Sequence, residues 1–111
     1  DTGGTHEPNG PQHMRRHMLD SDGKTLGRGE IFATSTAGYF DGFRIDTGNR
    51  IWTSAMDGVH CYDSAGSLIG KILIPEIVSN VCFGGLKRNR LFITATSSVY
   101  AVYLNVNGCC L

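Results

Sequence analysis

A stretch of this chain repeats itself 40 residues later, and this repeat limits the fold more than any other feature. Residues 49–62 align with residues 89–102, where Asn, Arg, Ala and Val recur and the Ile/Leu and Trp/Phe pairs stay apolar. A third, partial copy at residues 19–27 aligns with residues 62–70 at an offset of 43. A unit of roughly 40 to 45 residues that is rich in short β-segments is typical of a four-stranded propeller blade. The repeat therefore predicts an all-β fold built from such blades.

Short apolar or alternating segments between turn signals predict the individual strands. We expect strands at residues 13–19, 29–34, 42–46, 50–55, 59–62, 68–74, 80–84, 90–96 and 99–106. An Asp-Gly turn at Asp22-Gly23 would join the first two strands. The strands group into the end of one blade (1–36), a complete blade (37–76), three strands of a last blade (77–108) and a tail (109–111). Residues 1–111 thus form a single partial β-propeller domain of about two and a half antiparallel blades.

The number of blades suggests that the chain is a piece of a longer protein. A propeller closes with about 4 to 8 blades, whereas the repeat accounts for little more than two. The sequence also starts without Met. We therefore expect the remaining blades of a full propeller as partners. No targeting segment or membrane-length apolar run is visible, so we expect no membrane partner, although a missing N-terminus would have removed any signal.

Charge and cysteine content narrow the function classes further. Ten basic and ten acidic residues cancel, which leaves no electrostatic footprint for nucleic-acid binding. The four cysteines lack the spacing of a zinc site. We expect Cys61 and Cys82 to be reduced and buried, which suits a cytoplasmic protein.

Strand alternation places several polar residues on one face of the disc, where inner strands begin. Asp41 opens one inner strand, and Asn80 opens the corresponding strand one repeat later. A carboxylate at this point can face the channel, and hard cations such as Ca²⁺ or Mg²⁺ prefer several convergent oxygen ligands. The alternative for Asp41 is a turn aspartate before glycine. Asn80 either bonds a hydroxyl of a ligand or a metal-bound water, or caps a turn.

Two histidines are candidates for a general base, because imidazole titrates near neutral pH. His6 lies in a Gly/Pro-rich loop, residues 3–11, which can fold over the channel mouth and contact substrate. His60 belongs to a strand with alternating neighbours, which favours a structural histidine that is either packed or partly exposed.

Several motifs in combination resemble the family of senescence marker protein, gluconolactonase and luciferin-regenerating enzyme. They are Asp-Gly-Phe-Arg-Ile-Asp at 41–46, Asn-Arg-Ile-Trp at 49–52, Gly-Val-His-Cys-Tyr-Asp at 58–63, Gly-Ser-Leu-Ile-Gly-Lys-Ile at 66–72, Ser-Asn-Val-Cys-Phe-Gly-Gly at 79–85 and Leu-Phe-Ile-Thr at 91–94. The similarity spans residues 1–108. It implies the C-terminal third of a six-bladed propeller that binds one divalent cation on its axis and hydrolyses sugar lactones.

The resemblance also implies roles for individual residues. Asp41 matches the family's metal-binding Asp in an Asp-Gly dipeptide, whereas the family's Asn-Gly ligand motif would precede Asp1. Asp1 and Thr2 fall where the family's chain lines the rim of the substrate pocket, so both are candidate substrate contacts. The implied cofactor is one divalent cation, first Ca²⁺, with Zn²⁺, Mg²⁺ or Mn²⁺ as alternatives.

The resulting hypothesis is a fragment of a metal-dependent lactone hydrolase. The whole enzyme would open a small-molecule sugar lactone to its aldonic acid with metal-activated water, Asp41 holding the metal or acting as base. The fragment alone would be inactive because its metal site is incomplete. The alternative is a non-catalytic propeller that serves as a binding scaffold, since propellers host many unrelated functions.

Overall fold

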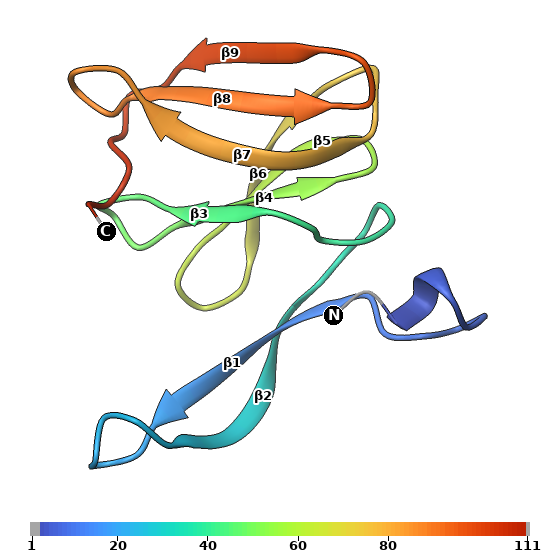
Figure 1. Cartoon of the computed structure of the whole chain (residues 1–111), viewed down its shortest axis with the longest axis vertical. Coiled ribbons are helices and arrows are strands. Elements are labelled where there is room, and N and C mark those ends of the chain that lie inside the picture. The colour runs from blue at the N-terminus through green and yellow to red at the C-terminus, as the bar shows by residue number, and fades with distance from the viewer. Residues whose placement is uncertain (1–2, 111) are drawn as a thin grey trace.

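The computed structural model describes residues 3–110, and within them the chain forms nine strands and one short 3-10 helix (Figure 1). In chain order the elements are η1 (Gly3–Thr5), β1 (His13–Leu19), β2 (Leu26–Thr34), β3 (Phe43–Ile45), β4 (Ile51–Ala55), β5 (Gly58–Tyr62), β6 (Leu68–Leu73), β7 (Val78–Gly84), β8 (Arg90–Ala95) and β9 (Val99–Tyr103). All strand pairs are antiparallel, in three sheets ordered β1-β2, β3-β4-β5-β6 and β7-β8-β9. The predicted all-β architecture is confirmed.

Each predicted strand is present, and the ends of β3, β4, β5, β6 and β8 differ from the predicted bounds by one residue. The larger shifts are in β7, which begins at Val78 rather than at residue 80, and in β2 and β9. β2 begins at Leu26 rather than at residue 29, because Asp22 caps the turn before it. One Asp22 oxygen accepts hydrogen bonds from the amides of Lys24 and Thr25, both at 2.8 Å. β9 ends at Tyr103 rather than at residue 106, because the segment after it leaves the sheet to contact two turns.

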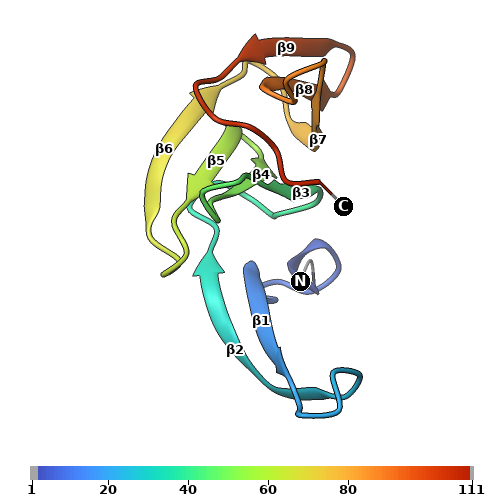
Figure 2. The same cartoon turned by 90° about the vertical axis from the view of Figure 1, so that its left-hand side faces the viewer.

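The four-stranded sheet lies between the other two sheets (Figures 1 and 2). On one side it packs against β7–β9 through a core that contains Val59, Val78, Val81, Phe83, Leu91 and Ile93. Trp52 and Phe83 meet edge to face there, with ring centroids 6.3 Å apart. On the other side a smaller cluster of Ala33, Phe40 and Tyr62 joins it to the β1–β2 hairpin. Every residue of β5 is buried as a result.

The outer faces of the end sheets remain open to solvent. The chain exposes 7011 Å², compared with about 6,000 Å² expected for a compact protein of this mass. Large apolar side chains of the β1–β2 hairpin contribute to the excess, namely Met18, Leu19, Leu26 and Ile31. These faces have the character of surfaces that further strands would cover. Among residues 3–110, no helix has the length and apolar character needed to cross a membrane.

The prediction for the cysteines is half right. The four cysteines, all within the described residues, are free thiols, and Cys61 is buried. Burial raises the pKa of the Cys61 thiol to about 11. Cys82, however, is exposed, so its predicted burial is wrong. Val81 and Phe83 face the core, and strand alternation turns the side chain between them to the open face.

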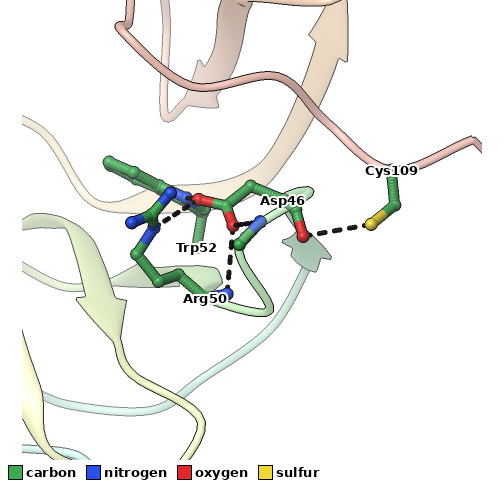
Figure 3. A network of polar contacts seen from close by, with 5 residues as sticks. Asp46, Arg50, Trp52 and Cys109 are labelled. Carbon is green, nitrogen blue, oxygen red and sulfur yellow. Dashed lines mark hydrogen bonds and ion pairs between the residues drawn. The ribbon is translucent and has the colours of Figure 1, made fainter.

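A buried carboxylate holds the turn between β3 and β4 (Figure 3). Asp46 is 0% exposed, and one of its oxygens accepts hydrogen bonds from the amides of Gly48 (2.8 Å) and Arg50 (3.1 Å). The other oxygen accepts from Arg50 Nε (2.7 Å) and Trp52 Nε1 (2.9 Å). Burial alone would raise the pKa of Asp46, but the hydrogen bonds from Trp52 and Arg50 outweigh it and hold that pKa below its ordinary value. Asp46 is therefore a structural group.

The C-terminal tail closes the same end of the molecule. Residues 107–109 accept a hydrogen bond from the amide of Thr47 (2.8 Å) and donate to the carbonyls of Arg88 (2.8 Å) and Ile45 (3.0 Å). The tail thus joins the β3–β4 turn to the β7–β8 turn. We call this end of the sheets the turn end, and the end at which β3 and β7 begin the opening end.

Candidate functional site

The structure brings the two predicted inner-strand residues to the opening end. β3 and β7 run in the same direction in Figure 1, so the chain enters both from one side. Asp41 precedes β3 by two residues, and Asn80 lies near the start of β7. The backbone of Gly42 lies so close to the Asn80 side chain that a Cβ at residue 42 would overlap it. This close approach, rather than an unusual backbone angle, is why glycine follows Asp41.

The backbone at Asp41 is held in place while its side chain is exposed. Phe40, the residue before it, is buried in the smaller core cluster. Ser54 Oγ, on β4, accepts hydrogen bonds from the amide of Asp41 at 2.9 Å and from that of Gly42 at 3.1 Å. The Asp41 side chain itself is exposed to solvent. The arrangement presents a carboxylate from an immobilised stretch of backbone.

Asp41 faces a cavity of about 340 Å³ at the opening end. Its lining combines the polar groups of Thr5, Asp41 and Ser79 with the apolar side chains of Tyr39, Phe40, Met56, Ile77 and Val78. Small-molecule sites typically have volumes of about 300–1,000 Å³ and a mainly apolar lining with few polar groups. The cavity is therefore suited to a small polar ligand that reaches one carboxylate.

Asn80 lies on a different hollow. It lines a space of about 170 Å³ together with Arg44 and Thr94. Its side-chain oxygen accepts a hydrogen bond from the Val81 amide at 2.9 Å. The structure places Asn80 beside Gly42 but not in the cavity that Asp41 lines, and its predicted substrate contact stays a prediction.

A larger hollow lies near the turn end. It has a volume of about 550 Å³ and is lined by Phe43, Arg44, Ile45, Asn49, Cys82, Phe83, Arg88 and Cys109. Its lining contains two arginines and no carboxylate, which does not suit a cation. The chemistry of Asp41 therefore points to the smaller cavity.

Of the three N-terminal residues predicted to contact substrate, the structure describes only His6. His6 is exposed in the loop after η1, and the neighbouring Thr5 lines the Asp41 cavity. Gly4 packs closely against the ring of Tyr39, which anchors this loop at the cavity mouth. His6 is thus near the site, and its contact with substrate stays a prediction. Asp1 and Thr2 lie outside the described residues.

The residues present fit a divalent cation in kind but not in number. Asp41 offers the oxygen ligand that Ca²⁺ and Mg²⁺ prefer, at the mouth of a cavity. Within residues 3–110, however, no three His, Cys, Asp or Glu side chains converge. Ca²⁺ takes about 6 to 8 oxygen ligands. The described residues can therefore supply one part of such a site, and the other protein ligands would have to come from elsewhere.

Asp57, His60 and Lys71 form a network of polar contacts near the opening end, and this network has a structural role. His60 is 0% exposed, and its Nε2 lies 2.6 Å from Asp57 Oδ1, while Lys71 Nζ lies 2.8 Å from Asp57 Oδ2. Burial alone would raise the pKa of Asp57, but hydrogen bonds from Lys71 and His60 hold it below its ordinary value. Both carboxylate oxygens are engaged, and of the two predicted environments of His60 the structure shows the packed one.

Sequence reasoning missed Ser54. Its hydroxyl lies inside a β-segment, where a serine carries no signal by itself. The repeat does contain one: Ser54 aligns with Thr94 at the 40-residue offset. A hydroxyl that recurs at the same place in two blades is a signal for a shared contact at the strand opening.

Comparison with known proteins adds a family match. The family described as the SMP-30/gluconolactonase/LRE-like region matches residues 11–97, which is most of the chain. No curated protein matches.

Solved structures agree with this match. A crystal structure of a protein assigned as a gluconolactonase is 36% identical, with a TM-score of 0.80 over 87% of this chain and 33% of that chain. A gluconolactonase from Xanthomonas campestris is 32% identical, with a TM-score of 0.66 over 78% of this chain and 27% of that one. Regucalcin from Agrobacterium tumefaciens, a calcium-binding protein, has a TM-score of 0.76 over 88% and 40%, but at 22% identity it shows likeness of fold alone.

The chain spans about a third of the length of these structures. The expected partial propeller is thereby confirmed as a fold class. Because the related structures contain further chain beyond the matched part, the partial coverage also explains why the end sheets of this chain have open faces.

Proposed function

The chain belongs to the SMP-30/gluconolactonase/LRE-like family, and on that basis we propose that it is part of a metal-dependent lactone hydrolase. In this proposal it supplies about two and a half blades of a six-bladed propeller, and the other blades complete the site. The reaction is the opening of a sugar lactone to its aldonic acid. Gluconolactonase relatives above 30% identity support this substrate class.

One observation carries the proposal. The Asp41 carboxylate lines the cavity of about 340 Å³, and the backbone amide of Asp41 is hydrogen-bonded to Ser54 Oγ. A divalent cation at such a site supplies Lewis acidity toward the lactone carbonyl. Asp41 contributes a negatively charged oxygen ligand, or takes the proton of the attacking water. One carboxylate does not easily do both, so we assign cation binding to Asp41 first.

Other residues have supporting roles in this proposal. The aromatic side chains Tyr39 and Phe40 and the thioether of Met56 line the cavity and exclude bulk water from one side of the lactone. Asn80 and His6 lie close enough to the opening end to bond a substrate hydroxyl in the completed propeller. Ca²⁺ is the first cation to test, because the Agrobacterium relative is a calcium-binding protein.

The test is the Asp41→Ala variant of the full-length protein, measured for glucono-lactone hydrolysis and for Ca²⁺ binding by calorimetry. We expect loss of both, with circular dichroism unchanged because the side chain is exposed. The matched control is Asp20→Ala, which removes an exposed aspartate of the β1–β2 connection. Undiminished turnover by Asp41→Ala would refute the assignment. A wild-type protein that binds ligands but hydrolyses no lactone would favour the scaffold alternative.

A further inference from the structure

The hydroxyl of Ser54 lies directly behind Asp41, on the neighbouring strand. Ser54 is 0% exposed, and its Oγ accepts hydrogen bonds from two consecutive amides, those of Asp41 (2.9 Å) and Gly42 (3.1 Å). Its own backbone amide donates to the Gly42 carbonyl at 2.9 Å. Three hydrogen bonds thus join one buried residue to the two residues at the opening of β3.

The two amides are placed so that they define the direction of the Asp41 side chain. Peptide groups are planar, and each residue has only two soft backbone angles between its flanking planes. The amide of Asp41 belongs to the plane before its Cα, and the amide of Gly42 belongs to the plane after it. An acceptor that holds both planes therefore sets both backbone angles of Asp41, and with them the direction of its Cα–Cβ bond.

The two amides do not depend on Ser54 equally. The amide of Gly42 also donates to the Ser79 carbonyl at 2.9 Å. The amide of Asp41 has no second acceptor among residues 3–110. Loss of the hydroxyl would therefore release the plane before Asp41 and leave the plane after it bonded.

We propose that Ser54 is a positioning residue that orients Asp41 toward the cation. The inference rests on the proposed function of Asp41. Ser54 is buried and is not part of the lining of the cavity that Asp41 faces, so it acts through the backbone and touches neither cation nor substrate. Loss of a group that orients a metal ligand typically lowers metal affinity about 10- to 100-fold.

The experiment compares Ser54→Ala with Ser35→Ala in the full-length protein. Ser35 is a matched control, because it is also a buried serine (8% exposed) whose Oγ accepts a loop amide, that of Ala37 at 3.2 Å. Ca²⁺ affinity is measured by calorimetry, amide exchange at residues 41 and 42 by NMR, and lactone hydrolysis as kcat and KM. Ser54→Cys, which keeps the shape of the side chain and a weak acceptor, provides a milder variant in case Ser54→Ala does not fold.

We expect Ser54→Ala to raise the Ca²⁺ dissociation constant about 10- to 100-fold and to speed exchange of the Asp41 amide more than that of the Gly42 amide. Ser54→Cys should fall between Ser54→Ala and wild type, and Ser35→Ala should change neither readout. Wild-type Ca²⁺ affinity in Ser54→Ala overturns the inference. So does an equal loss in Ser54→Ala and Ser35→Ala, which would mean a general loss of stability.

Failure of the proposed function gives a different pattern. If the wild-type protein neither binds Ca²⁺ nor hydrolyses a lactone, the proposed function fails, and amide exchange decides the positioning separately. Faster exchange at Asp41 in Ser54→Ala alone then supports backbone positioning by Ser54. Exchange equal to that of wild type overturns it.

Discussion

The sheets β3–β6 and β7–β9 share one sequence repeat but hold the start of their first strand in opposite ways. In the first sheet, Ser54 Oγ accepts from the two amides at residues 41 and 42. In the second, Thr94 at the equivalent position donates to the Asn80 carbonyl at 3.3 Å and bonds the Ser79 hydroxyl at 3.0 Å. In the first blade the hydroxyl therefore holds the backbone that presents the exposed Asp41 carboxylate. In the second blade the hydroxyl at the same position bonds only to neighbouring polar groups of Ser79 and Asn80. The carboxylate of the candidate site therefore comes from the first of these two blades, while Ile77, Val78 and Ser79 of the second line the same cavity.

The turn ends of the two sheets differ in a similar way. The β3–β4 turn is organised by the buried carboxylate of Asp46. The β7–β8 turn has no such group among the described residues and relies on Gly85, with φ of +81°, and on the Arg88 amide, which donates to the Gly85 carbonyl at 3.0 Å. Both turns are closed by a backbone hydrogen bond, that of the Asn49 amide to the Asp46 carbonyl being 3.0 Å in the first, but only the first has a buried carboxylate as well. The two turns should therefore respond to different substitutions.

The largest effect is expected for Asp46→Ala. This substitution leaves the Arg50 guanidinium and the Trp52 indole N–H without their acceptor, and we expect a loss of about 3 kcal/mol in unfolding free energy. Gly85→Ala, which strains a positive-φ position, should cost about 1 kcal/mol. Urea denaturation of the full-length protein measures both. Equal costs for the two variants would break the distinction between the turns.

Exchanging the two strand openings tests whether the carboxylate must lie in the first blade. Asp41→Asn removes the charged ligand, and we expect Ca²⁺ affinity to fall by about 100-fold or more, beyond the usual effect of an indirect partner. Adding Asn80→Asp should not restore it, because Asn80 lines a separate hollow. Calorimetric titration of the single and double variants gives the answer. Recovery of wild-type affinity in the double variant would show that the two openings are interchangeable.

The pH dependence of stability sharpens the comparison of the turns. The folded-state pKa of Asp46 is lowered, so its stabilisation is complete above the unfolded pKa of about 3.9 and is lost as the pH falls through the lower folded pKa. As the pH is lowered from 6, the free energy of unfolding should fall more steeply in wild type than in Asp46→Asn. The two falls should differ by a value on the order of 1 kcal/mol. Glu76, whose pKa is lowered to about 2 by hydrogen bonds from Ser97 and Tyr100, contributes equally to both proteins. Parallel curves would contradict the assignment to Asp46.

The smallest effect is expected for Thr94→Val. Its hydroxyl bonds to exposed neighbours, so its loss should cost less than about 1 kcal/mol and leave Ca²⁺ affinity within twofold of wild type. Thermal denaturation and calorimetry measure the two quantities. A loss of affinity as large as that of Ser54→Ala would show that both blades build the site.

The sequence was sufficient for the strands and insufficient for several side-chain environments. The repeat aligned the blades, so the strands and the common end of Asp41 and Asn80 followed from alternation. The sequence pattern predicts β9 too long, because the tail contacts that end the strand involve Thr47 and other residues far away in sequence. The burial predicted for Cys82 is wrong because an apolar segment does not reveal which of its faces is covered. The separate hollows of Asp41 and Asn80 depend on how two sheets pack, which no local pattern records.

The tail contacts have a consequence for the order in which the chain folds. Residues 107–109 bond to Thr47 and Ile45, about sixty positions earlier in the chain. Contacts between such distant segments require closure of a long loop and slow folding. During synthesis, the β3–β6 sheet can pair before residue 107 has left the ribosome, but its turn end cannot yet be joined to the β7–β8 turn. The turn end of the two blades is therefore completed last, after the strands that the tail connects there have formed.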